Sequence, residues 1–214
     1  MNYRENTDIF NFKLLKDVRL TKHGIPIIKG TDYYPKQFIS FNYVLSTKNR
    51  RDFGVHFYID DYQFERIWNS PTKYTKILKQ FDCLIGPDFS MYKNFPKPLQ
   101  IFNLYKQRLL MAYWQNQGLK VIPNICWSSL DDLDFCLEGL PKYSVVALST
   151  NGCLNKKVKI EFVQCFEKMV DILKPLKIII IGSIPKELDK YKNIILQFNS
   201  HINHFEKLKK GVKI

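Results

Sequence analysis

The chain has 214 residues, of which 45% are hydrophobic and 14% aromatic, which excludes an intrinsically disordered protein and predicts one domain with a substantial core. The formal net charge of +13 at pH 7 favours an anionic partner such as nucleic acid or a nucleotide, unless it reflects only a lysine-rich composition. The five cysteines form no Cys-x-x-Cys pair, which favours a reducing cytoplasm over secretion.

Residues 1–52 are the least regular part of the sequence and carry a net charge of +5. Proline and glycine residues interrupt short apolar stretches at 25–28 and 38–41, which are candidates for short strands. A basic run after them is typical of an exposed loop. We interpret its cations as candidate nucleic-acid contacts, namely Lys48, Arg50 and Arg51.

Five β-rich apolar runs follow, and each ends in a polar or Gly/Pro cluster before a helical pattern begins. They cover residues 56–61, 83–88, 120–124, 144–149 and 178–181. This alternation is typical of βαβ units, because parallel neighbours need a long crossover instead of a hairpin. We therefore expect an α/β fold of repeated βα units with a mostly parallel sheet, in which residues 53–183 form the core.

The segments between these runs have the apolar spacing of amphipathic helices. The expected helices cover 62–68, a segment beginning at Pro71 with Ser70 as N-cap, 99–117 with Gly118 as its end, a short segment after a capping box of Ser129 and Asp132, and 157–173.

The end of the chain is basic, because residues 141–214 carry a net charge of +8. We expect residues 184–214 to add a last strand at 193–198 and a final basic helix. Two lysines of this helix are further candidate nucleic-acid contacts, Lys209 and Lys210.

Two architectures satisfy the βα alternation: a compact or incomplete βα-barrel and an open doubly wound sheet. We favour the barrel because polar residues end most of the apolar runs. A barrel recruits most of its strand ends to the functional site, whereas an open sheet concentrates ligand contacts at one switch point.

In either architecture the carboxyl ends of parallel strands meet at one edge, which is the predicted site. Asp60 ends the first run and Asp88 ends the second. Together they would bind Mg²⁺, or one of them would act as a general acid or base. The alternative is that both carboxylates cap the helices that follow. Of the adjacent pair, we expect Asp61 to be the cap and Asp60 the functional group.

Polar and aromatic groups at the ends of the later runs are candidate substrate contacts, namely Asn124, Trp127, Ser149, Thr150, Asn151 and Ser183. Asn124 would orient a polar group, and Trp127 would stack on a base or sugar unless it is a buried cover of the sheet. The turn at residues 149–152 would hold a phosphate with its backbone amides, although it lacks the lysine and the spacing of a P-loop.

Four sequence strings resemble a family of unknown function that occurs in phages, prophages, plasmids and other mobile elements, especially of firmicutes. The strings are VHFYIDDYQFERIW at residues 55–68, GPDFS at 86–90, GLKVIPN at 118–124 with Trp127, and STNG at 149–152. The resemblance covers roughly residues 24–183. It implies a mobile-element context and transfers no activity and no catalytic residue.

We therefore expect a cytoplasmic protein of a phage or plasmid that acts in its bacterial host on a phosphate-bearing ligand, either nucleic acid or a nucleotide. Such an activity would use Mg²⁺ or acid/base chemistry at the strand ends. The alternative is a non-catalytic module that binds nucleic acid or a host or phage protein, such as a replication accessory or counter-defence factor. No apolar run is long enough to span a membrane, so we expect no membrane partner.

Overall fold

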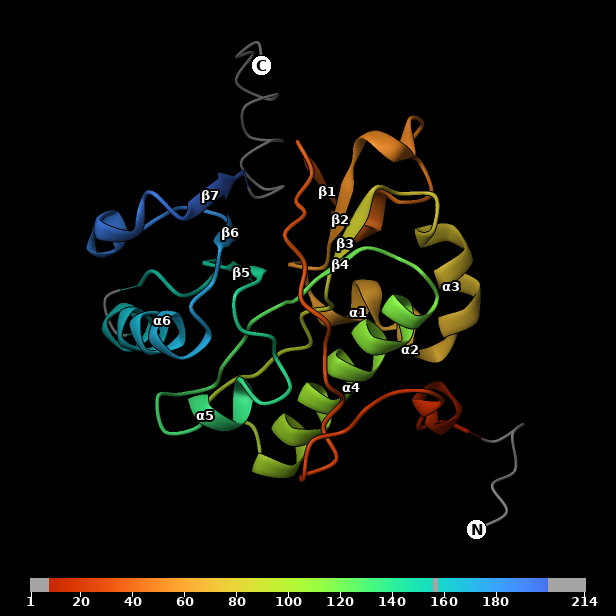
Figure 1. Ribbon diagram of the computed structural model, residues 1–214, viewed down its shortest axis with the longest axis horizontal. Coiled ribbons are helices and arrows are strands. Elements are labelled where there is room, and N and C mark those ends of the chain that lie inside the picture. The colour runs from red at the N-terminus through yellow and green to blue at the C-terminus, as the bar shows by residue number, and fades with distance from the viewer. Residues whose placement is uncertain (1–7, 156–157, 200–214) are drawn as a thin grey trace.

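The computed structural model describes residues 8–155 and 158–199. The candidate contacts Lys209 and Lys210 lie outside the described residues. Two sheets organise the described chain, and each has only parallel strand pairs (Figure 1). One sheet contains β1 (Phe38–Ser40), β2 (Gly54–His56), β3 (Cys83–Ile85) and β4 (Val121–Ile122), and the other contains β5 (Val145–Ser149), β6 (Lys177–Ile181) and β7 (Ile195–Phe198). The expected α/β fold with parallel strands is confirmed.

The strand order in both sheets follows the chain, β1-β2-β3-β4 and β5-β6-β7, without a reversal. One parallel bridge, between Asn124 and Ala147, joins the end of the first sheet to β5. The ring centroids of Phe38 in β1 and Phe198 in β7 lie 4.9 Å apart. No ladder joins β1 to β7 in the described ranges, so the strands form no closed barrel. Because no switch point interrupts the order, the arrangement is that of an incomplete barrel.

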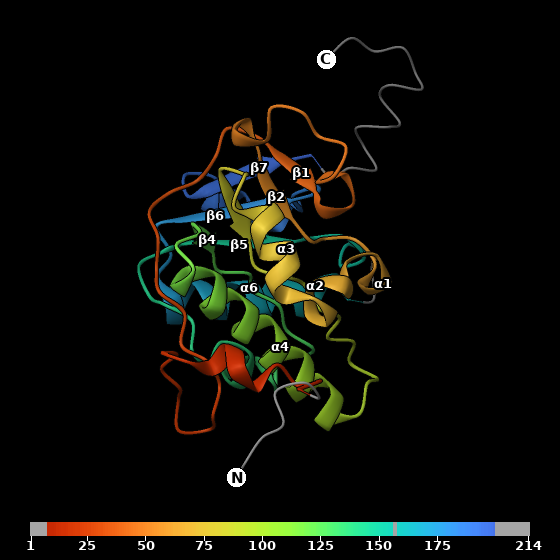
Figure 2. The ribbon, with the colours of Figure 1, turned by 90° about the vertical axis from the view of Figure 1, so that its right-hand side faces the viewer.

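The inner faces of the two sheets share one apolar cluster, to which Ile85, Ala147 and Ile179 contribute. Alternate residues of the same strands point outward, because successive side chains of a strand face opposite ways. The outward side of the first sheet packs on α3 (Pro71–Leu78) and α4 (Lys97–Asn116), which lie in front of it in Figure 2. The outward side of the second sheet packs on α5 (Leu133–Cys136) and α6 (Lys159–Leu173).

Several helices agree with the sequence pattern. The helix predicted at 99–117 is α4, and Gly118 follows it with a φ of +82°, a conformation that glycine adopts readily. Helix α3 begins with Pro71, and α6 ends at Leu173 as expected. The predicted strand at 38–41 corresponds to β1, whereas residues 25–28 form no strand and contribute only an isolated antiparallel bridge from Pro26 to Leu20.

Two predicted helix caps were wrong. The segment 62–68 is divided into α1 (Asp61–Phe64) and α2 (Arg66–Asn69), so that Asp61 is the first helical residue and Asp60 occupies the N-cap position. The proposed capping box at Ser129 does not form, because α5 begins only at Leu133. The hydroxyl of Ser129 donates instead to the carboxylate of Asp132 at 3.2 Å. Neither Asp61 nor the Ser129–Asp132 pair therefore has the capping role that the sequence spacing predicts.

The remaining described elements are short 3₁₀ helices, which occupy Phe12–Leu15 (η2), Phe41–Tyr43 (η3), Arg50–Asp52 (η4) and Lys186–Tyr191 (η5). Segment η4 leads directly into β2 and so lies at the amino ends of the strands. Figure 1 shows this segment above the first sheet, and α1, which follows β2, below it. The two ends of the first sheet therefore carry different sets of functional candidates.

Candidate ligand-binding pocket at the carboxyl ends of the strands

A pocket of about 840 Å³ opens at the predicted edge of the sheets. We call it the carboxyl-end pocket. Its walls come from the segments that follow β1, β2, β3, β4 and β5, together with Phe162 of α6. Its lining includes Tyr58, Asp60, Asp61, Asp88, Ser90, Tyr92, Phe95, Cys126, Trp127, Ser149, Asn151 and Cys153. Most of the strand ends contribute, as the barrel-like arrangement predicts.

Asp88 is half-buried and lines this pocket, and its carboxylate accepts a hydrogen bond from Asn124. The side-chain amide nitrogen of Asn124 donates to Oδ1 of Asp88 at 3.0 Å and to the backbone oxygen of Pro87 at 3.1 Å. The amide oxygen of Asn124 accepts from the hydroxyl of Tyr58 at 2.8 Å. Asn124 is fully buried, so these three hydrogen bonds fix its orientation.

Burial raises the pKa of Asp88 to about 7. The hydrogen bond from Asn124 acts in the opposite direction, and the negative charge of Asp61 adds a smaller increase. Burial also raises the pKa of Tyr58 well above its usual value, so its hydroxyl stays protonated and donates. Asp88 is therefore a carboxyl group that can gain or lose a proton near neutral pH, which is the property required of a general acid or base.

Arg108 of α4 forms a hydrogen bond with the backbone of Asn124. Its guanidinium is fully buried and donates to the backbone oxygens of Asn124 at 3.2 Å and Cys136 at 2.7 Å, and more weakly to that of Glu138 at 3.4 Å. Burial lowers the pKa of Arg108, but an arginine remains charged at neutral pH. The arginine thus connects α4 to the segment after β4 and fixes the residue that supports Asp88.

Gly86 allows the segment after β3 to pass close to α4 on its way to Asp88. A Cβ atom at Gly86 would lie 2.2 Å from Sδ of Met111 and 3.1 Å from Cβ of Asn124. Such contacts are too short for any side chain to be added without displacement of these neighbours. The glycine of the GPDFS string is therefore required by close packing beside the Asp88–Asn124 pair.

Asp60 and Asp61 both line the pocket, but Asp61 is not the helix cap expected from the sequence. Asp60 is exposed at the N-cap position of α1 without a capping hydrogen bond, and its carboxylate accepts from Nε2 of Gln63 at 3.3 Å. Asp61 accepts from the hydroxyl of Ser90 at 2.9 Å and from its backbone N–H at 3.1 Å. Asp61 thus links the segment after β2 to the one after β3.

The other candidate substrate contacts are only partly brought together. Trp127 lies at the pocket wall, where its ring centroid is 5.5 Å from that of Phe162. Ser149 and Asn151 also line the pocket. Thr150 is buried behind it with no hydrogen-bond partner for its hydroxyl among the described residues, and Ser183 is exposed and outside the lining.

Two cysteines of the pocket are unsuited to nucleophilic chemistry. Burial raises the pKa of Cys126 and raises that of Cys153 to about 11. The thiol of Cys126 donates to Oε1 of Gln107 at 3.0 Å. Since the thiolate is the reactive form, neither side chain is activated.

The charge of the pocket differs from that of the whole chain. Its described lining contains Asp60, Asp61 and Asp88 but no lysine or arginine. Within the described ranges no group of three or more His, Cys, Asp or Glu residues is placed to hold a metal ion. Mg²⁺ at Asp60 or Asp88 would need its other ligands from water and substrate phosphates, as is usual for this ion.

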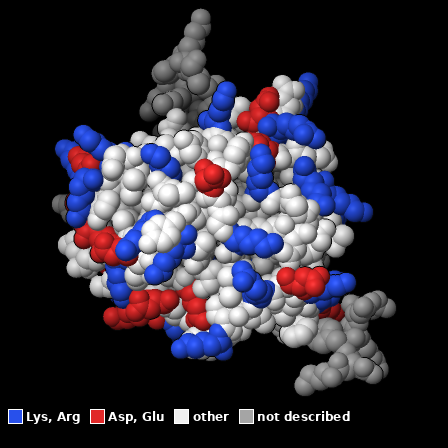
Figure 3. Space-filling view, viewed as in Figure 1, with Lys and Arg blue, Asp and Glu red and all other residues white. Residues whose placement is uncertain are grey.

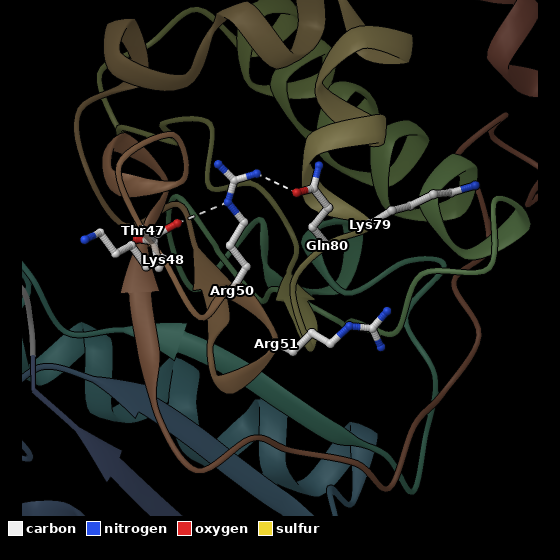
Figure 4. A pocket seen from close by; sticks show the side chains of 6 residues that line it. All are labelled: Thr47, Lys48, Arg50, Arg51, Lys79 and Gln80. Atoms are coloured by element: carbon white, nitrogen blue, oxygen red, sulfur yellow. Dashed lines mark hydrogen bonds between the residues drawn. The ribbon is translucent and has the colours of Figure 1, made fainter.

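The cationic candidates of the N-terminal part lie at the opposite ends of the strands. Lys48, Arg50 and Arg51 line a second pocket of about 470 Å³ together with Thr47, Lys79 and Gln80 (Figure 4). The structure therefore separates the predicted acidic and basic site residues into two sites.

Sequence reasoning missed the aromatic lining and the buried support of the carboxyl-end pocket. The residues that the sequence analysis does not identify are Tyr58, Arg108, Tyr92 and Phe95. Tyr58 could have been found, because it lies two residues before Asp60 near a strand end. The sequence contains no such signal for Arg108, which reaches its partners from the middle of a long helix.

Comparisons with known proteins agree with the resemblance seen in the sequence. The chain is 33% identical over 184 residues to the "Gene 1 protein" of Mycobacterium phage L5, covering 83% of this chain and 78% of the relative. It is 34% identical over 138 residues to the "Gene 1 protein" of Mycobacterium phage D29, covering 64% of this chain and about half (51%) of the relative. No solved structure matches the chain.

The family comparison extends further along the chain than the four strings. A family model matches residues 19–199, which include the described strands from β1 to β7. The described helices include none that is both long and apolar enough for a membrane span. Both relatives are phage proteins, which agrees with the expected phage context. The chain belongs to the family described as Domain of unknown function (DUF4417).

Proposed function

We propose that the chain binds the base of a nucleotide or of a nucleic-acid strand in the carboxyl-end pocket and that Asp88 exchanges a proton with this ligand. The observation that carries the proposal is the position of Asp88, a carboxyl group with a pKa of about 7 that faces the pocket and is held by the fully buried Asn124. Near neutral pH this carboxyl group both donates and accepts hydrogen bonds.

The lining supports a flat, polar ring as the ligand. Tyr92, Phe95 and Trp127 provide aromatic faces in the wall, and stacking on such faces is a general way to bind a base. The edge of a base carries neutral donors and acceptors, which suit the carboxyl group of Asp88. A phosphate alone would meet carboxylates without a described cation, so the phosphates of the ligand extend out of the pocket or carry Mg²⁺ bound by Asp60 or Asp88.

In this proposal Asp88 is the acid/base group and Trp127 the stacking group, while Asn124 and Arg108 position Asp88. The proton goes to or comes from a ring nitrogen or hydroxyl of the ligand that contacts Asp88. The relation to phage proteins suggests that the ligand is met in the cytoplasm of an infected bacterium. The five free thiols agree with that compartment.

Thermal unfolding with a panel of nucleosides, nucleoside phosphates and inorganic phosphate, each with and without Mg²⁺, tests the proposal. A ligand at 100 times its Kd adds about 2.7 kcal/mol of stability, which corresponds to a rise in Tm of roughly 5 to 10 °C for a chain of this length. We expect this rise for at least one nucleoside or nucleotide with the wild-type chain, and a much smaller rise with Asp88→Asn or Trp127→Leu.

Asp189→Asn is the matched control, because Asp189 is an exposed carboxylate of η5 outside the pocket lining. This variant should respond to the ligand as the wild-type chain does. The proposal is wrong if no base-containing ligand raises Tm, if inorganic phosphate produces the same rise as a nucleotide, or if Asp88→Asn responds like the wild-type chain.

A further inference from the structure

The second pocket lies at the amino ends of the strands and has a lining unlike that of the carboxyl-end pocket. We call it the basic pocket. It is formed by Thr47, Lys48, Arg50, Arg51, Lys79 and Gln80. Arg50 and Arg51 belong to η4, which leads into β2, while Lys79 and Gln80 follow α3 on the way to β3. The basic pocket and Asp88 are therefore at opposite ends of the same strands.

Arg50 is held in a fixed position within the basic pocket. Its guanidinium donates to Oε1 of Gln80 at 2.6 Å and to the backbone oxygens of Thr47 at 3.2 Å and Leu45 at 3.3 Å. It also lies 5.8 Å from the ring centroid of Phe81. Three of its five N–H groups are used, so two remain for a ligand in the described structure. An arginine fixed in this way loses little side-chain entropy when it binds an anion.

The four cations of the basic pocket are not paired with a carboxylate in the described structure, although Asp52 follows Arg51 in η4. None of Lys48, Arg50, Arg51 and Lys79 forms an ion pair with a carboxylate within the described ranges. Lys76 is one helical turn before Lys79 and is also exposed. Figure 3 shows lysine and arginine side chains over much of this face, and one group of them lies toward the upper right with an acidic side chain beside it, on the side where Figure 1 places α3 and the segment before β2.

The arrangement of these cations fits an extended polyanion better than a single phosphate. In Figure 4 the guanidinium of Arg50 points toward Gln80, Lys48 extends to one side, and Arg51 and Lys79 extend to the other. Their charged ends spread along the surface and do not converge on one point. A chain of phosphates meets such a row of cations one after another, whereas one phosphate ion would contact only one or two of them.

We propose that the basic pocket binds consecutive phosphates of a nucleic-acid backbone. Contacts of this kind position a nucleic acid without reading its sequence, so the binding is independent of base composition. The proposal goes beyond the ligand of the carboxyl-end pocket, because backbone phosphates at the amino ends of the strands do not involve Asp88.

Fluorescence anisotropy with a labelled duplex DNA of about 20 base pairs tests this binding on the full chain at salt concentrations from about 50 to 200 mM. Duplex DNA is used because its bases are paired, so they cannot enter the carboxyl-end pocket. The triple variant Lys48→Glu, Arg51→Glu, Lys79→Glu changes exposed side chains and keeps the hydrogen bonds of Arg50. We expect it to weaken binding more than tenfold and to reduce the slope of log K against log salt by about 2 to 3.

The matched control is Lys142→Glu, Lys186→Glu, Lys192→Glu, which makes the same change in net charge at exposed lysines outside the basic pocket. It should keep binding within about threefold of the wild-type chain, as Asp88→Asn should. The proposal is wrong if both triple variants weaken binding equally, if polyglutamate competes as well as DNA does, or if inorganic phosphate at the same phosphate concentration displaces the duplex. Thermal unfolding of each variant verifies that it is folded.

Discussion

The amide of Asn124 joins two groups from the segments that follow β3 and β2: it donates to Asp88 and accepts from the hydroxyl of Tyr58. Because Asn124 is fully buried, it cannot exchange these partners for water without a large cost. The hydrogen bond from Asn124 uses Oδ1 of Asp88 and leaves Oδ2 for a ligand in the pocket. The site therefore combines a rigidly held amide, that of Asn124, with an ionisable carboxyl group, that of Asp88, which lines the pocket.

The hydroxyl of Tyr58 should contribute measurably to stability. Tyr58→Phe removes the donor to Oδ1 of Asn124 and leaves a buried acceptor unsatisfied. We expect the free energy of unfolding, measured by urea denaturation, to fall by about 1 to 2 kcal/mol. Tyr62→Phe is the control, since Tyr62 is 80% exposed, and it should have almost no effect. Equal effects of the two substitutions would contradict the buried network.

The raised pKa of Asp88 should make stability depend on pH in a defined direction. The carboxyl group binds its proton more tightly in the folded chain, with a pKa of about 7, than in the unfolded chain, for which 3.8 is the reference value. Between these values the folded state holds more protons, so the contribution of Asp88 to stability decreases as pH rises through this window. Asp88→Asn removes this dependence.

Urea denaturation at about pH 5 and pH 8 measures the effect as a difference between variants. On going from the lower to the higher pH, Asp88→Asn should gain at most about 3 kcal/mol relative to the wild-type chain, at 1.4 kcal/mol per pKa unit. The other titrating groups are the same in both chains, so their effect cancels when the free energy of unfolding of the wild-type chain is subtracted from that of the variant at each pH. A difference that is the same at both pH values would show that Asp88 titrates normally.

The sequence predicted several of the nearly completely buried strands well, but it placed the first run at 56–61, whereas the buried strand β2 covers Gly54–His56. Runs such as Ile178–Ile181 and Cys83–Ile85 are buried on both faces, so their apolar character is continuous and visible in the sequence. Helix α4 was predicted from its spacing and from Gly118. These features depend on local residues, and local residues are what a sequence pattern reports.

The partners of the site residues could not be predicted in the same way. Asp61 looked like a helix cap because it precedes a helical pattern, but its carboxylate binds Ser90 in the segment after the next strand. Arg108 lies on a helix whose spacing indicated only an amphipathic surface, yet it is fully buried against backbone oxygens. Contacts between distant segments depend on tertiary geometry, which has no signature in residue spacing.

Arg108 should be important for stability even though no carboxylate pairs with it among the described contacts. Arg108→Lys keeps the charge but replaces a planar group with one ammonium, which cannot reach the same separate backbone oxygens. We expect the free energy of unfolding to fall by about 3 kcal/mol or more.

The matched control for this substitution is Arg66→Lys. Arg66 is exposed, and in the described structure its guanidinium donates to the neighbouring backbone oxygen of Gln63 and lies 5.4 Å from the ring centroid of Phe41. This variant should lose less than about 1 kcal/mol in the same urea measurement. If Arg108→Lys is as stable as Arg66→Lys, the buried guanidinium does not hold the segment after β4.

The close approach at Gly86 predicts a non-additive pair of substitutions. Gly86→Ala places a methyl group against Met111 and should cost about 1 to 3 kcal/mol of stability. In the Met111→Ala background the same change should cost clearly less, because the contacted side chain is gone. Gly30→Ala is the control, since its Cβ would meet its neighbours at an ordinary 3.4 Å. Strictly additive costs for Gly86 and Met111 would contradict the packing described.

The most direct test of the proposed site is a ¹³C NMR titration of the side-chain carboxyl carbon of Asp88, without ligand and with the nucleoside or nucleotide that stabilises the chain most. We expect a midpoint near pH 7 in the free chain and a displaced midpoint when the ligand is bound, because binding and protonation at one site are linked. A midpoint near pH 4, or one that the bound ligand leaves unchanged, would show that Asp88 does not exchange a proton with the ligand.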